Sequence, residues 1–223
     1  MRKPRPGWFT VLKSYFREIL IESTSSAYSG QLEVTFYAGR YMLNTRNATY
    51  SYEDRYTSYG TALEVVADRI PACKKILVLG MGLGSVPWIL QKKYGYRGEI
   101  TCVDIDPIIL QLATDYYPDA ELLKFLHLVE ADAATWVPAQ QGSFDLITVD
   151  LFIDRNVPKT LHSREFLAAL KSRLAPDGTL LFSRLKDEKQ DEDELWANLS
   201  SIFPDSSDID TGGNVILCFR QDV

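Results

Sequence analysis

The sequence contains few residues of the kinds that bind structural zinc or form disulfides. Among its 223 residues there are two histidines, His127 and His162, and three cysteines, Cys73, Cys102 and Cys218. No CxxC pair or Cys/His cluster occurs, which argues against a zinc site, and we expect no metal. An odd cysteine count, with Cys102 inside an apolar run, is typical of free thiols in a reducing compartment. We therefore expect a cytoplasmic protein.

Long apolar runs and an excess of positive charge are also absent. No segment approaches the roughly 20 apolar residues that a membrane-spanning helix needs. The chain has 24 Lys and Arg against 30 Asp and Glu, a net charge of −6, which disfavours a general nucleic-acid binder. We expect a small-molecule substrate and neither nucleic acid nor a membrane as partner.

The amino-terminal segment differs from this acidic average. The first 17 residues contain five basic side chains and no acidic one. Polar residues interrupt the segment 8–20, so the apolar core of a signal peptide is missing. We interpret the segment as a solvated arm.

The residue pattern divides the chain into a β-rich first part and a second part in which strands and helices alternate. With 46% hydrophobic and 24% charged residues it has the composition of a folded protein. Residues 1–57 predict a β-rich region, with strands at Glu18–Glu22, Gln31–Ala38 and Arg40–Leu43 and a hairpin turn at Tyr37–Arg40. Such short strands are not stable alone, so we expect them to pack against a second domain formed by residues 58–223.

From about residue 58, strands and helices alternate. Helices are predicted after several strands, and one of them has Asp106 as its N-cap and Pro107 as its first residue. The apolar runs of strand length are Lys75–Leu79, Glu99–Val103, Phe125–Val129, Phe144–Val149, Thr179–Ser183 and Asn214–Phe219. Continuous apolar strands that alternate with helices predict an α/β fold with a mostly parallel sheet covered on both faces.

The residues that follow these strands are candidates for a binding site, because ligands of such sheets bind beyond the carboxyl ends of the strands. The first strand is followed by Gly80, Gly82 and Gly84 in GxGxG spacing, which is typical of loops that hold S-adenosylmethionine. Asp104 ends the second strand, where a carboxylate can accept both hydroxyl hydrogens of a ribose.

The next two strands also end in acids. Asp132 follows the third strand and could accept the amino group of adenine, while the small Ala133 leaves room for the ring. Asp150 directly follows the fourth strand. Each acid alone is an ordinary loop residue, but their joint occurrence at one sheet edge predicts a nucleoside pocket.

The sequence resembles the spermidine synthase-like branch of the class I S-adenosylmethionine-dependent methyltransferase superfamily, from about Gln31 to Arg184. The resemblance is carried by the segments Ile76–Ser85, Val103–Pro107, Ala131–Ala133, Val149–Phe152 and Leu161–Phe166. It implies a Rossmann-like sheet preceded by a small N-terminal β-sheet, and a homodimer. The implied donor is S-adenosylmethionine or its decarboxylated form.

The resemblance also implies roles for individual residues. Asp104 would hold the ribose, Asp132 the adenine amino group, and the loop Gly80–Gly84 the methionine-derived tail. Asp150 falls on the acid that deprotonates the attacking amine. Tyr59 falls on a tyrosine of the substrate groove, and Asp154 lies one residue later than a second acid of that groove.

Three differences in the substrate groove and glycine loop separate this chain from the aminopropyltransferases of this branch. Leu83 replaces an Asp of the glycine loop, Gly60 and Thr61 replace a His and a Glu, and a Gln after the hairpin is absent. Because an acid near the donor tail would repel a carboxylate, Leu83 favours methyl transfer to an unidentified small molecule. The alternatives are aminopropyl transfer in polyamine biosynthesis and a non-catalytic nucleoside-binding or assembly protein.

Overall fold

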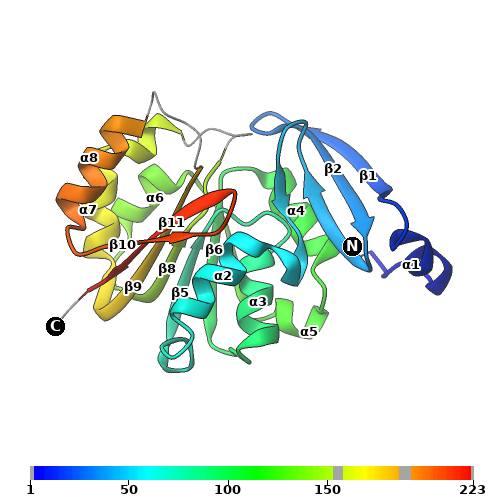
Figure 1. Cartoon of the computed structure of the whole chain (residues 1–223), viewed down its shortest axis with the longest axis horizontal. Coiled ribbons are helices and arrows are strands. Elements are labelled where there is room, and N and C mark those ends of the chain that lie inside the picture. The colour runs from blue at the N-terminus through cyan, green and yellow to red at the C-terminus, as the bar shows by residue number, and fades with distance from the viewer. Residues whose placement is uncertain (1–2, 153–157, 186–191, 222–223) are drawn as a thin grey trace.

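The computed structural model describes residues 3–152, 158–185 and 192–221, which form two sheets and the helices that cover them (Figure 1). The larger sheet has the order β10-β11-β9-β8-β5-β6-β7. Its parallel neighbours run from β9 to β7, and β11 pairs antiparallel with both β9 and β10. The strands are β5 Lys75–Leu79, β6 Glu99–Asp104, β7 Leu126–Glu130, β8 Phe144–Val149, β9 Leu174–Leu185, β10 Ser207–Asp210 and β11 Asn214–Arg220.

Helices cover both faces of this sheet because successive residues of a strand point to opposite sides and the central strands are apolar on both. Ile76 and Val78 of β5 pack on one side against α2 Thr57–Val65, α3 Ser85–Lys93 and α4 Pro107–Tyr116. Leu77 and Leu79 pack on the other side against α6 Ala133–Ala139, α7 Arg164–Ser172 and α8 Glu192–Ile202. The predicted Rossmann-like methyltransferase fold is confirmed.

The smaller sheet is antiparallel and has the order β1-β2-β3-β4. Its strands are β1 Ile19–Ser26, β2 Gly30–Tyr37, β3 Arg40–Asn44 and β4 Thr49–Ser51. The predicted hairpin turn is present, with positive φ at both central residues, 47° at Ala38 and 79° at Gly39. Apolar residues of β2 and β3 join the same hydrophobic cluster as α3 and α4, so the two sheets share a core.

Several elements differ from the sequence prediction. A short helix α1, Trp8–Ser14, precedes β1, and α5, Ala120–Leu123, precedes β7. Helix α6 was not predicted, because Pro138 lies inside it and its seven residues are too few to show a helical period. Strand β9 begins at Leu174, five residues before the strand predicted at Thr179–Ser183.

No helix in the described part of the chain combines the length and apolarity needed to cross a bilayer. All three cysteines are free thiols.

Candidate active site

A cavity of about 620 Å³ lies at the carboxyl ends of β5, β6, β7 and β8. This volume falls within the range of roughly 300–1,000 Å³ that small-molecule sites occupy. Six of the residues predicted from the sequence line it: Gly80, Gly82, Asp104, Asp132, Ala133 and Asp150. Residues 28–29 and 47–50 of the smaller sheet also line it, so both sheets contribute walls.

The glycine loop has a backbone path that excludes side chains. Gly80 has φ 93°, and a Cβ on it would lie 2.2 Å from the carbonyl oxygen of Asp150. A Cβ on Gly82 would lie 3.0 Å from the carbonyl oxygen of Tyr50. Gly84, the N-cap of α3, does not line the cavity; a Cβ there would meet the Tyr117 ring at 2.6 Å. Two glycines therefore bring backbone to the cavity, and the third allows the loop to pack on the core.

Asp104 joins this loop to β6. Its carboxylate accepts the backbone N–H of Met81 at 2.9 Å and that of Asp106 at 3.0 Å. Burial raises the pKa of Asp104 to about 6. A carboxylate has about four acceptor positions, so Asp104 keeps capacity to receive a hydroxyl of a bound diol.

Asp106 fixes the smaller sheet against the cavity. Its Oδ1 accepts the N–H of Ile108 at 3.0 Å, which confirms its predicted role as the N-cap of α4. Its Oδ2 accepts hydrogen bonds from the hydroxyls of Ser26, the last residue of β1, and Ser29, in the turn to β2. Sequence reasoning missed these two serines, because no local pattern links residues about 80 positions apart.

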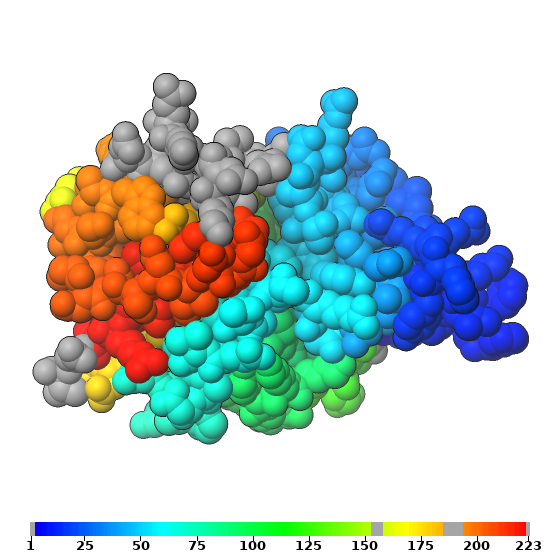
Figure 2. All heavy atoms as spheres, viewed as in Figure 1, coloured from blue at the N-terminus to red at the C-terminus, as the bar shows by residue number. Residues whose placement is uncertain are grey.

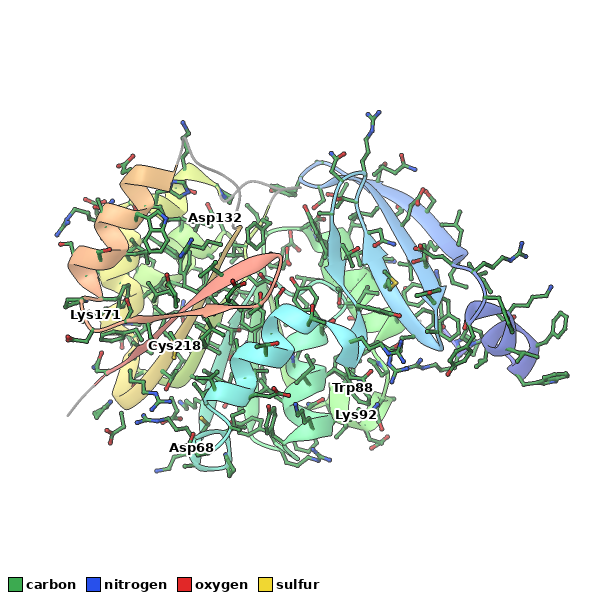
Figure 3. All side chains as sticks on the ribbon, in the orientation of Figure 1. Asp68, Trp88, Lys92, Asp132, Lys171 and Cys218 are labelled. Carbon is green, nitrogen blue, oxygen red and sulfur yellow. The ribbon has the colours of Figure 1, made fainter. Side chains whose placement is uncertain are left out.

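Asp132 lies at the opposite end of the large sheet from Asp68 (Figure 3). It is the N-cap of α6, and its Oδ1 accepts the N–H of Ala134 at 2.9 Å. With Ala133 it lines the cavity, where its second oxygen can receive a donor group of a ligand.

The two carboxylate oxygens of Asp150 differ in their hydrogen bonding. The hydroxyl of Tyr56 donates to its Oδ2 at 2.7 Å, and its Oδ1 has no hydrogen-bond partner among the described residues. Burial raises the pKa of Asp150 to about 6, while the hydroxyls of Tyr56 and Ser183 act in the opposite direction. Burial and the Asp150 charge raise the pKa of Tyr56 well above 10, so Tyr56 remains a hydrogen-bond donor at neutral pH.

The structure brings Tyr56, and not Tyr59, to the cavity. Tyr59 is fully buried, and its hydroxyl lies 2.7 Å from the carbonyl oxygen of Val149 and 3.2 Å from that of Leu181. Its ring stacks behind that of Tyr56, with 6.3 Å between centroids. The prediction that Tyr59 contacts substrate is therefore not supported by its position. Asp154 lies outside the described residues.

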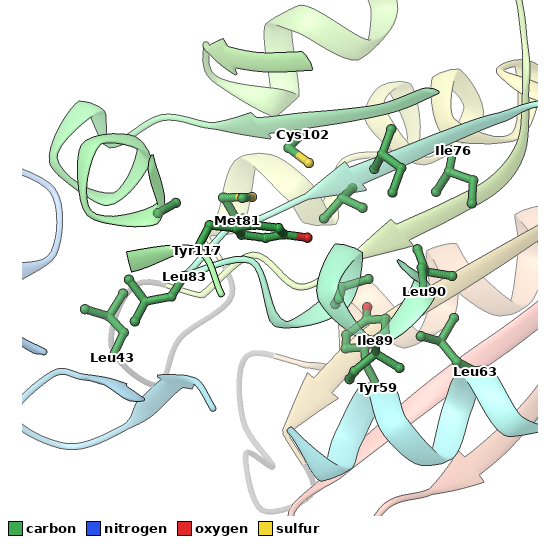
Figure 4. Close-up of a cluster of buried hydrophobic side chains, with 14 of the residues drawn as sticks. Leu43, Tyr59, Leu63, Ile76, Met81, Leu83, Ile89, Leu90, Cys102 and Tyr117 are labelled. Atoms are coloured by element: carbon green, nitrogen blue, oxygen red, sulfur yellow. The ribbon is translucent and has the colours of Figure 1, made fainter. Parts of the chain in front are cut away.

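Leu83 also lies away from the cavity. It is 3% exposed and belongs to the hydrophobic cluster that contains Leu43 and Tyr117 (Figure 4). It does not line the cavity, so its position gives no support to the argument that its side chain selects the donor. The loop turns this side chain toward the smaller sheet, a direction that spacing alone does not reveal.

The charged side chains that line the cavity in the described ranges are all acidic. Four carboxylates line it, those of Asp104, Asp106, Asp132 and Asp150, and no Lys, Arg or His does so in the described ranges. Among these residues no group of three or more His, Cys, Asp or Glu is arranged to hold a metal ion. The walls therefore favour ligands that carry positive charge.

The sequence is similar to one protein family and to several proteins of known name. The model of the spermine/spermidine synthase domain matches residues 56–203. A polyamine aminopropyltransferase of Vibrio vulnificus is 30% identical over 135 residues, which cover 60% of this chain and 44% of that protein. A human eEF1A lysine and N-terminal methyltransferase is 25% identical over 143 residues, which cover 58% of this chain and 20% of that protein.

The solved structures agree on the fold. A spermidine synthase from Thermotoga maritima superposes with a TM-score of 0.71 at 16% identity, over 92% of this chain and 74% of that one. The chain spans about half the length of the first polyamine aminopropyltransferases it matches, 44% of one and 58% of another.

Proposed function

Because the chain belongs to the spermine/spermidine synthase family, we propose that it transfers an aminopropyl group from decarboxylated S-adenosylmethionine to an amine. The observation that carries this proposal is the cavity lined by four carboxylates and, in the described ranges, by no basic side chain. The relatives named polyamine aminopropyltransferase favour the same reaction over methyl transfer to a small molecule, which the sequence alone ranked first.

The charges of the two donors differ at the tail. Decarboxylated S-adenosylmethionine carries a sulfonium and an ammonium group, both cationic, whereas S-adenosylmethionine adds a carboxylate. In this cavity that carboxylate would face acidic side chains, and no described basic lining residue would compensate it. An acidic cavity without cations therefore favours the decarboxylated donor.

Asp150 is the residue that we assign to proton removal. An alkylamine is protonated at neutral pH, and it must lose a proton before its nitrogen can attack. With a pKa of about 6, Asp150 is mostly ionised at pH 7, so it can hold the ammonium group and accept its proton. The free Oδ1 is the accepting atom, because Oδ2 is held by Tyr56.

The donor supplies an activated carbon next to the sulfonium, so the protein needs mainly to align the reactants. Asp104 and Asp132 would fix the ribose and the adenine, and the backbone at Gly80 and Gly82 would approach the tail. The carbon–sulfur bond breaks as the new carbon–nitrogen bond forms, and the sulfonium leaves as a neutral thioether.

The nucleoside by-product tests the proposal. Aminopropyl transfer releases 5′-methylthioadenosine, whereas methyl transfer releases S-adenosylhomocysteine. The chain is incubated with each donor and a panel of diamines, and the by-product is identified by mass spectrometry. We expect methylthioadenosine from the decarboxylated donor, with turnover lost in Asp150→Asn although the donor still binds.

Methyl transfer to an amine is the second candidate, and the similarity to the human eEF1A lysine and N-terminal methyltransferase favours it. The Asp150–Tyr56 pair can deprotonate a lysine or terminal amine equally well. Release of S-adenosylhomocysteine alone would establish this reading. Binding of both donors without either by-product would support the non-catalytic alternative.

A further inference from the structure

The short helix α1 presents its apolar face to the outside of the molecule. Trp8, Leu12 and Phe16 follow one another at four-residue spacing, so they share one side of the helix and of the turn that follows it. Their exposed fractions are 78%, 52% and 83%. Phe9 and Tyr15, both more than half exposed, widen the same face.

The opposite side of α1 attaches it to the protein. Ser14 is fully buried, and its Oγ accepts the N–H of Gly39 at 3.0 Å. The carbonyl oxygen of Ser14 accepts the N–H of Ala38 at 2.9 Å, and Val11 packs against the core. The polar contacts of Ser14 face the body while Trp8 and Phe16 face away, which is the reverse of a helix that packs on a core. The Tyr15 ring is also half exposed, but its hydroxyl lies beside Gly39.

Basic side chains border this face. Lys13 and Arg17 are exposed, and neither forms an ion pair with a described acidic residue. The Nζ of Lys13 lies 4.4 Å from the centroid of the Phe9 ring. Exposed aromatic rings next to uncompensated Lys and Arg are typical of helices that lie in the interface of an anionic bilayer.

The position of α1 allows a flat surface to reach it. The helix lies at the end of the molecule opposite α7 and α8 (Figure 1). In the space-filling view the amino-terminal residues form a protruding tip (Figure 2). A membrane can therefore contact α1 without meeting the rest of the chain.

We propose that the α1 face, formed by Trp8, Phe9, Leu12, Tyr15 and Phe16 with Lys13 and Arg17 at its border, docks on anionic lipid headgroups. A second copy of the chain is the competing occupant. Lys13 and Arg17 at the border form no ion pair with a described acidic residue, so the face favours a negatively charged surface. Anionic lipid complements the same charges.

This inference departs from the expectation of no membrane partner, which rested on the absence of an apolar run long enough to span a membrane. A net charge of −6 conceals a local excess, because the first 17 residues carry five basic side chains and no acid. The inference is independent of the transfer reaction.

Vesicle flotation of the full chain tests the proposal. We expect it to float with vesicles of equal parts phosphatidylglycerol and phosphatidylcholine, to remain behind with phosphatidylcholine alone, and to be released by salt. The pair Trp8→Ser and Phe16→Ser should abolish flotation, and the pair Lys13→Glu and Arg17→Glu should weaken it at least about ten-fold. Phe125→Ser, at a partly exposed aromatic residue elsewhere, is the matched control and should float normally.

Three results would overturn the proposal. They are absence of flotation, equal flotation with both vesicle types, and flotation that survives Trp8→Ser with Phe16→Ser. A dimer seen by light scattering that the same pair converts to a monomer, without any flotation, would assign the face to a second copy instead. The substituted side chains are exposed, so unchanged thermal unfolding should verify that the variants fold.

Discussion

The hydroxyl of Tyr56 donates a hydrogen bond of 2.7 Å to Oδ2 of Asp150, although 94 residues separate them in the chain. Tyr56 precedes the first turn of α2, and Asp150 follows the last residue of β8. The contact leaves Oδ1 of Asp150 as a buried oxygen without a hydrogen-bond partner among the described residues. The pair influences the pKa of Asp150.

Tyr56→Phe should raise the pKa of Asp150 above its present value of about 6, because the hydroxyl stabilises the ionised form. A hydrogen bond to a charged group contributes roughly 1.5–3 kcal/mol, which corresponds to about 1–2 pH units. Since Asp150 must be ionised to accept a proton, the acidic limb of the kcat/KM profile should move to higher pH. The matched control is Tyr59→Phe, whose hydroxyl contacts only backbone oxygens and should leave the midpoint unchanged. An unshifted limb in Tyr56→Phe would refute the assignment.

Asp150→Asn should stabilise the folded chain at pH 7. The pKa of Asp150 rises from 3.8 to about 6 on folding, so the folded state binds the proton more tightly. The wild-type free energy of unfolding therefore falls as pH rises from about 4 to 6, and the uncharged Asn avoids this loss. The gain is up to about 3 kcal/mol at pH 7 and disappears below about pH 4. Urea unfolding at both pH values measures it, and a gain that is equal at pH 4 and pH 7 would contradict the role of charge burial.

Leu83→Asp should destabilise the chain and leave its donor preference unchanged. Leu83 packs beside Leu43 and Tyr117, so an acid there would bury a charge among apolar side chains at a cost of several kcal/mol. Thermal unfolding should show a lower Tm, while Leu83→Met, which preserves the volume, should show little change. Calorimetry with both donors completes the test; a folded Leu83→Asp protein with altered donor choice would show that the side chain does reach the ligand.

Gly80→Ala should reduce both stability and donor binding. The added Cβ would lie 2.2 Å from the carbonyl oxygen of Asp150, so the β8 end must move. Gly142 has the same φ of 93° with nothing within 4 Å of its Cβ position. Gly142→Ala should therefore lower the free energy of unfolding only through backbone strain, by about 1–2 kcal/mol. Chemical unfolding of both variants separates the two effects. Equal losses would mean that the close approach at Gly80 is unimportant.

The local features of this protein could be predicted because their causes are local. The turn between Tyr37 and Arg40 needs residues that accept positive φ, and strand Lys75–Leu79 is apolar from Ile76 onward because both its faces are buried there. The N-cap role of Asp106 requires only a free carboxylate two residues before an N–H. The acids of the cavity were identifiable for a related reason, because parallel strands bring their carboxyl ends to one edge.

Tertiary structure alone decided which side chains face the cavity and which face the core. Tyr56 and Tyr59 lie three residues apart at the start of α2. The packing of this helix near the ends of β8 and β9 determines that the Tyr56 hydroxyl bonds to Asp150, whereas the Tyr59 hydroxyl bonds to backbone carbonyl oxygens. The same applies to Leu83, which the loop turns toward Leu43, and to α1, whose aromatic face points outward because Ser14 is hydrogen-bonded to the β2–β3 turn. These outcomes depend on contacts between segments distant in the chain, which a periodic pattern along one segment does not encode.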